Sequence, residues 1–256
     1  MKIHGMQRRI SQLLLLAVFA CNLANSSTLT ANAEPTKVTK PASVNPNRFI
    51  RDIKMFEEND ERNPPSAEGT EFVGSSSIAL WKSIPEDFKE WNAFGRGFGG
   101  STIPEVTHYA DRIITNYKPA RIVFYAGTND IAELGHSGKQ VFESFMTFVR
   151  FIKSKLPDAH IYFVSMSMAP SRVQWKKQYE EGNSLVRAYC KTDPKVHYIN
   201  VVPFMQDRAG KPIGAYFGLD QLHMNRSGYL IWIREIKKAL GESSTKPPTK
   251  DPNKKA

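Results

Sequence analysis

Residues 72–81 read Phe-Val-Gly-Ser-Ser-Ser-Ile-Ala-Leu-Trp: an apolar run that stops at Gly74, three hydroxyl residues, and a second apolar run of helical character. This order predicts a buried strand over 70–74 that turns sharply into a helix. In a parallel sheet such turns lie at the carboxyl ends of the strands, where ligands bind. A serine there has an exposed hydroxyl and a free N–H for an oxyanion, as a nucleophile needs. The same residues would also make an ordinary turn and helix cap.

Predicted strands alternate with predicted helices along the rest of the chain. The near-continuous apolar run at 121–126 is typical of a strand that is covered on both faces of a sheet. The predicted strands lie at 70–74, 91–94, 121–126, 161–164 and 196–202, and the main helices at 49–63, 84–91, 103–117, 137–156, 171–191 and 229–240. This alternation predicts an α/β fold, a three-layer α/β/α domain around a doubly wound, five-stranded parallel sheet.

Three loops that follow predicted strands carry groups that suit attack on an ester. They hold the serines 75–77, then Gly99-Gly100-Ser101, and then Asn129. Because the carboxyl ends of parallel strands meet at one edge of a sheet, these loops are expected to converge. A backbone N–H at a glycine and a side-chain amide are both donors that can stabilise an oxyanion. Each loop could instead be an ordinary turn.

A loop before the last predicted helix carries Asp220-Gln221-Leu222-His223. A carboxylate three residues before a histidine can fold back to accept the Nδ1 proton, which leaves Nε2 free to take a proton from a serine. This spacing is weak evidence alone, and its place beside the predicted sheet edge adds to it.

These blocks, taken together, resemble the SGNH or GDSL-type esterases and acylhydrolases. The order and spacing match over residues 49–241, and the first block is similar to that of bacterial exported relatives of platelet-activating-factor acetylhydrolase catalytic subunits. The blocks are Gly74-Ser75-Ser76-Ser77-Ile78, a glycine block that ends at Gly100, Gly127-Thr128-Asn129-Asp130, and Asp220 with His223. The resemblance implies a flavodoxin-like SGNH hydrolase fold and ester hydrolysis without a metal or organic cofactor.

The resemblance also implies a role for each matching residue. Ser76 would be the nucleophile, Gly100 and Asn129 the oxyanion donors, His223 the general base, and Asp220 the carboxylate that orients it. The commoner family block has an aspartate where this chain has a serine before Ser76, so the choice among the three adjacent serines stays open. The expected substrates are short acyl esters, such as acetyl esters of carbohydrates or of lipid-like alcohols.

Composition divides the chain into four parts. Residues 1–33 resemble a signal peptide, 34–48 a flexible linker, 49–241 the hydrolase domain, and 242–256 a disordered basic tail. The formal charge of +10 lies mostly at the ends, because 49–241 holds 25 basic and 22 acidic residues. A domain so close to neutral lacks the basic surface of a nucleic-acid-binding protein.

The first residues predict an exported bacterial protein. Basic residues precede a short apolar run, and Ala31-Asn32-Ala33 offers a cleavage site. The alternative is a lipoprotein signal in which Cys21 is lipidated, and this lipid anchor would be the protein's link to a membrane. The sequence does not indicate an oligomeric state.

Two further interpretations compete with the esterase. Residues 95–100 match the Gly-x-Gly-x-x-Gly dinucleotide pattern, but no good strand precedes them and no acidic residue follows at the required distance. The histidines outside the Asp220 block lack paired ligand spacing, so the sequence predicts no metal site. A non-catalytic carbohydrate- or partner-binding module on the same fold stays an alternative, as does a thioesterase or lysophospholipase.

Overall fold

The computed structural model describes residues 45 and 47–244, with side chains to residue 241. A five-stranded sheet lies at its centre in the order β2-β1-β3-β4-β5, and every neighbouring pair is parallel. This is the flavodoxin-like order, with its switch point between β1 and β3, and it confirms the predicted fold class. The strands are β1 (Thr70–Gly74), β2 (Phe94–Gly97), β3 (Arg121–Tyr125), β4 (His160–Val164) and β5 (Val196–Ile199).

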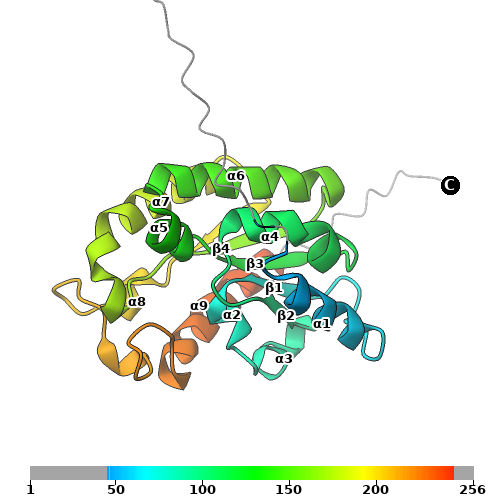
Figure 1. Cartoon of the computed structure of the whole chain (residues 1–256), viewed down its shortest axis with the longest axis horizontal. Helices are drawn as coiled ribbons and strands as arrows, with labels where there is room; N and C mark the ends of the chain where they lie inside the picture. Colours follow the sequence, from blue (N-terminus) through cyan, green and yellow to red (C-terminus); the bar gives the residue numbers. More distant parts are fainter. Residues whose placement is uncertain (1–44, 46, 245–256) are drawn as a thin grey trace, which may run out of the picture. The chain divides into compact units, whose positions relative to one another are not determined.

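Helices cover both faces of the sheet (Figure 1). One face packs against α1 (Ile50–Asp60), α4 (Ile103–Ala110), α6 (Gly138–Lys155) and α7 (Lys176–Cys190). The other packs against α2 (Ser76–Ala79), α3 (Ile84–Asp87), α8 (Val202–Met205) and α9 (Arg226–Ser244). The remaining helical segments are η1 (Lys89–Trp91), η2 (Asp111–Thr115), α5 (Thr128–Leu134), η3 (Pro170–Trp175) and η4 (Gly214–Tyr216).

Aromatic side chains fill the two layers between sheet and helices. Phe124 of β3 lies 4.4 Å from Phe148 of α6, measured between ring centroids, and both are fully buried. On the opposite face the Trp232 ring of α9 lies 4.6 Å from that of Tyr125. Successive residues of one strand therefore bury their side chains in opposite layers, as a sheet covered on both faces requires.

Strand β2 differs from its predicted position. The sequence predicted a poor strand at 91–94, whereas the strand spans Phe94–Gly97. Two glycines and a charged residue do not have the composition of a strand, but here each has a structural reason. A Cβ on Gly97 would lie 2.3 Å from the Ala79 nitrogen of α2. The Arg96 side chain is buried in an ion pair with Asp60, at 2.6 Å.

The helices are more divided than predicted. Residues 171–191 were expected to form one helix, but Arg172 has non-helical angles (φ −128°, ψ 21°) within η3, and α7 begins only at Lys176. The predicted helix at 103–117 is α4 followed by the π-helical turn η2. The helix predicted directly after the strand at 70–74 is α2. The sequence did not predict α5, α8 and η4, which are too short to show a periodic pattern.

Two expectations concern the ends of the chain. The predicted signal peptide, nearly all of the predicted linker and residues 245–256 lie outside the described residues. Among the helices that are described, none combines the length and the apolar character needed to cross a membrane.

The start of α9 is fixed to the α3 region by a buried carboxylate. The side chain of Asp87 accepts two hydrogen bonds from the Arg226 guanidinium at 2.6 Å and a third from Trp81 Nε1 at 2.8 Å. These contacts, Arg226 first, lower the pKa of Asp87 to about 2. This anchor holds the end of the loop that precedes α9.

Gly74→Ala should destabilise the domain more than a matched glycine change. A Cβ on Gly74 would lie 1.9 Å from the Tyr125 carbonyl oxygen, at a φ of +145°, whereas Gly210 has a φ of +75° and open space around it. We expect Gly74→Ala to lower the free energy of unfolding by about 3 kcal/mol or more. Gly210→Ala, which carries only backbone strain, should cost about 1–2 kcal/mol. If urea denaturation showed equal losses of unfolding free energy for Gly74→Ala and Gly210→Ala, this account would be contradicted.

Asp87→Asn should reduce stability in a pH-dependent way. The depressed pKa of Asp87 means that its contribution is present above the unfolded-state pKa of an aspartate and is lost as pH falls toward about 2. We expect a loss of about 1–2 kcal/mol at pH 7 that disappears near pH 2, measured by denaturant unfolding at each pH. Asp158→Asn removes an exposed carboxylate and is the control, since its pair with Lys195 lies in solvent. A pH-independent difference would show that charge is not the cause.

Candidate active site

The three serines occupy different environments where β1 turns into α2. Ser75 is the residue before the helix, in extended conformation, and is only 1% exposed. Ser76 is the first residue of α2, and its side chain and that of Ser77 line a pocket. The first N–H groups of a helix have no acceptor within the helix. Ser76 therefore combines an accessible hydroxyl with a free backbone donor, as expected of the predicted nucleophile.

The glycine loop lies against the start of α2. Gly100 has a φ of +80° and is the third residue of a turn closed by the bond from the Ser101 N–H to the Phe98 carbonyl, at 3.3 Å. A Cβ built on Gly99 would lie 4.0 Å from Cβ of Ser76. The predicted convergence of these two strand-end loops is thus present in the structure.

Arg48 holds the glycine loop from outside. Its guanidinium donates to the Gly100 carbonyl at 3.2 Å and pairs with Glu105 and Glu133, each at 3.2 Å. Glu105 in turn closes the capping box of α4 with Thr102. The sequence indicated no such role, because Arg48 is the last residue of a stretch rich in Pro and Asn that is typical of a linker.

Asn129 ties the glycine loop to η3. It lies in the first turn of α5, after Gly127 in a left-handed conformation, and is 4% exposed. Its Nδ2 donates to the Ser101 carbonyl at 3.1 Å, and its Oδ1 accepts from Arg172 Nη1 at 2.9 Å. An amide nitrogen carries two hydrogens, so one remains for a ligand.

Asp130, in the same block, has a structural role. Its two carboxyl oxygens accept the Ile103 N–H at 3.2 and 3.1 Å, which fixes the start of α4. Burial raises the pKa of Asp130 to about 7. The residue is fully buried and is not among those that line the pocket.

His223 and Asp220 form the predicted pair in the loop before α9. Asp220 Oδ2 lies 2.6 Å from His223 Nδ1, and Oδ1 accepts the N–H groups of Leu222 and His223 at 3.0 Å each. These backbone bonds, together with the histidine, lower the pKa of Asp220 to about 2. An ionised partner on Nδ1 selects the tautomer in which Nε2 can accept a proton.

A small pocket with a cavity volume of about 30 Å³ brings together residues that lie far apart in the sequence. Ser76 and His223 both line it, although 147 positions separate them in the sequence. Gly100 and Asn129 are not lining residues, and Asn129 reaches the pocket through Arg172. Two of the five predicted site residues, Ser76 and His223, therefore line the pocket. Asp220 contacts His223, and the glycine loop lies next to Ser76.

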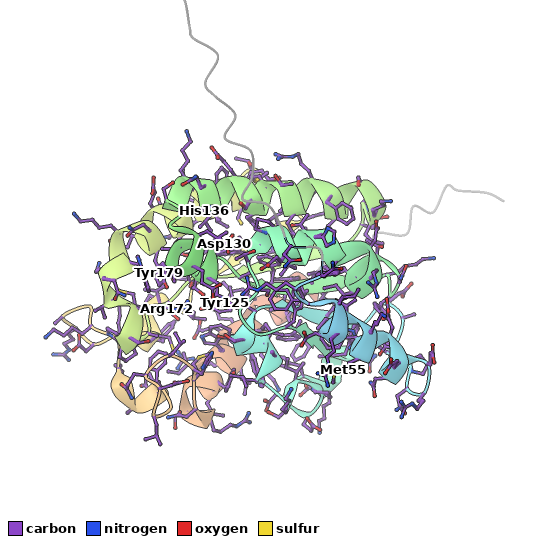
Figure 2. The ribbon with its side chains drawn as sticks, viewed as in Figure 1. Met55, Tyr125, Asp130, His136, Arg172 and Tyr179 are labelled. Carbon is purple, nitrogen blue, oxygen red and sulfur yellow. The ribbon has the colours of Figure 1, made fainter. Side chains whose placement is uncertain are left out.

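Most of the lining residues did not emerge as site candidates from the sequence, and Tyr125, Arg172 and Tyr179 are among them. Figure 2 shows Tyr125, Arg172 and Tyr179 in one region below α5, and all three line the pocket. Trp232 also lines the pocket. Arg172 follows a proline in a short 3-10 segment and has no motif around it. Only the tertiary structure brings it to Asn129.

Among residues 45 and 47–241, no group of three His, Cys, Asp or Glu side chains could hold a metal ion. His160 and His197 do meet, with ring nitrogens 2.9 Å apart, but on β4 and β5 and without a third ligand of this kind.

Comparison with known proteins identifies the family. The profile of the GDSL-like Lipase/Acylhydrolase family matches residues 70–231, more than half of the chain. No curated protein matches the sequence.

Solved structures share the fold. A GDSL-like lipase from Bacteroides thetaiotaomicron VPI-5482 has a TM-score of 0.63 at 23% identity, over 75% of this chain and 98% of its own. A protein from Streptococcus pneumonia, described as a candidate platelet activating factor, has 0.62 at 18%, over 74% and 92%. A family 3 carbohydrate esterase from Clostridium thermocellum has 0.56 at 15%, over 70% and 99%. The chain thus belongs to the GDSL-like lipase/acylhydrolase family of carboxylic ester hydrolases.

Proposed function

We propose that the protein hydrolyses short acyl esters, with acetyl esters of carbohydrates as the favoured class, through an acyl-enzyme on Ser76. The observation that carries the proposal is the shared pocket of Ser76 and His223, in which Asp220 holds the imidazole at 2.6 Å. A binding module would have no need of a nucleophile, a base and an orienting carboxylate in this arrangement.

The proposed reaction has two steps. Ser76 Oγ attacks the ester carbonyl while His223 Nε2 takes its proton, and the protonated imidazole then gives that proton to the leaving alcohol. Water, deprotonated by the same histidine, releases the acid and restores the serine. The negative charge on the tetrahedral oxygen would be stabilised by the N–H groups of Ser76 and Gly100 and by Asn129 Nδ2.

The size of the pocket supports a short acyl group. Its cavity volume of about 30 Å³ leaves room for only a small group. Aromatic side chains close it, since Tyr125 and Trp232 are both buried and in edge-to-face contact. The carbohydrate part of the proposal has support from the carbohydrate esterase among the structural neighbours, which at 15% identity shares the fold. The export predicted from residues 1–33 would give such an enzyme access to extracellular carbohydrate.

The decisive experiment is hydrolysis of p-nitrophenyl acetate by the purified chain. We expect Ser76→Ala to lower kcat by about 10⁴-fold or more, because it removes the attacking oxygen. Ser77→Ala keeps that oxygen and should lose at most about tenfold. Both variants should keep the wild-type unfolding transition.

A substrate panel then tests the acyl group. Acetyl esters, including acetylated sugars, should exceed butyryl and octanoyl esters in kcat/KM, since longer chains do not fit the pocket. Equal rates for wild type and Ser76→Ala would remove Ser76 from its role. Absence of turnover on acetyl, butyryl and thioester substrates would favour a binding module.

A further inference from the structure

The pocket contains a cation without an acidic partner. Arg172 lines it, and the ion pairs among residues 45 and 47–241 do not include this guanidinium. One of its five N–H groups donates to Asn129 Oδ1 at 2.9 Å, and its Cζ lies 5.9 Å from the centroid of the Trp175 ring. No Asp or Glu is among the residues that line the pocket. A half-buried charge in such a place favours an anionic ligand.

Two neutral donors among the residues that line this pocket also lack acceptors. The Tyr179 hydroxyl and Trp232 Nε1 are buried, and neither proton has an acceptor in the described part of the chain. Burial raises the pKa of Tyr179 and the neighbouring Arg172 opposes this only in part, so the hydroxyl stays a neutral donor. A buried donor without a partner costs free energy that a bound acceptor would recover.

We propose that the natural ester carries a carboxylate or phosphate beside the scissile bond, and that Arg172 binds this group with Tyr179 and Trp232 as further donors. This inference rests on the proposed function, since it names the substrate class of the same site. Arg172 already contacts Asn129, the proposed oxyanion donor, so the anionic group must lie close to the ester carbonyl. A guanidinium suits the task, because its planar fork matches two oxygens of one anion.

Arg172 has a competing explanation. Its bond to Oδ1 fixes the Asn129 amide with Nδ2 available as a donor, and this positioning alone would help every substrate equally. Recognition of an anion would instead help only charged substrates. The ratio of kcat/KM between a charged ester and its neutral counterpart separates the two roles, because the contribution from Asn129 cancels.

The test uses two matched pairs of esters. On the alcohol side, 2-acetoxybenzoate is compared with its methyl ester, and on the acyl side, mono(4-nitrophenyl) succinate is compared with its methyl ester. We expect Arg172→Gln to lower the charged-to-neutral ratio at least about tenfold for one pair. Arg172→Lys should retain an intermediate ratio. Arg208→Gln, which removes one exposed positive charge, should leave the ratio unchanged. An equal loss on both members of each pair would overturn the proposal.

A binding measurement tests the anion site independently of ester hydrolysis. In the Ser76→Ala background, succinate and inorganic phosphate should raise the melting temperature or change tryptophan fluorescence, and Arg172→Gln should weaken this binding at least about tenfold. Binding without any ester hydrolysis would leave the anion site standing while the proposed function fails. If the protein hydrolyses neutral esters, responds to neither anion and shows no preference for charged esters, the proposed function stands and the anion site is overturned.

Discussion

The backbone contact between the first and third strands is the constraint on which the site depends. The Ser75 N–H donates to the Tyr125 carbonyl at 3.0 Å, and the approach is this close because residue 74 has no side chain. The same stretch then turns into α2, so the position of Ser76 follows directly from the pairing of β1 with β3. A nucleophile placed by sheet hydrogen bonds is held more rigidly than one on a free loop.

The opposite half of the site is positioned by charge rather than by the sheet. His223 lies on an irregular loop, where Asp220 fixes its ring and two backbone N–H groups fix Asp220. The loop ends where Arg226 meets Asp87 near α3, a partner far away in the sequence. Backbone hydrogen bonds of the sheet thus position Ser76, whereas the carboxylates of Asp220 and Asp87 position His223 and its loop.

The sequence predicted the class of fold well because buried parallel strands are apolar runs that local composition reveals, as at β1 and β3. It failed at β2, where Arg96 and two glycines have reasons that lie in other elements. For the candidate site, the family resemblance predicted roles for Ser76, Asn129 and the Asp220–His223 pair. Arg172 could not be found in this way, because its role depends on η3 lying beside α5, which no local pattern encodes.

The contacts of Arg48 limit how far the N-terminus can be shortened without loosening the site. One guanidinium serves three acceptors, two carboxylates and the Gly100 carbonyl, and it comes from a position before the first helix. A mature protein that began at residue 34 would keep these three contacts of Arg48. Proteolysis beyond residue 48 would leave two like charges facing an unsupported glycine turn, and so would loosen the oxyanion side without touching any residue that takes part in the chemistry.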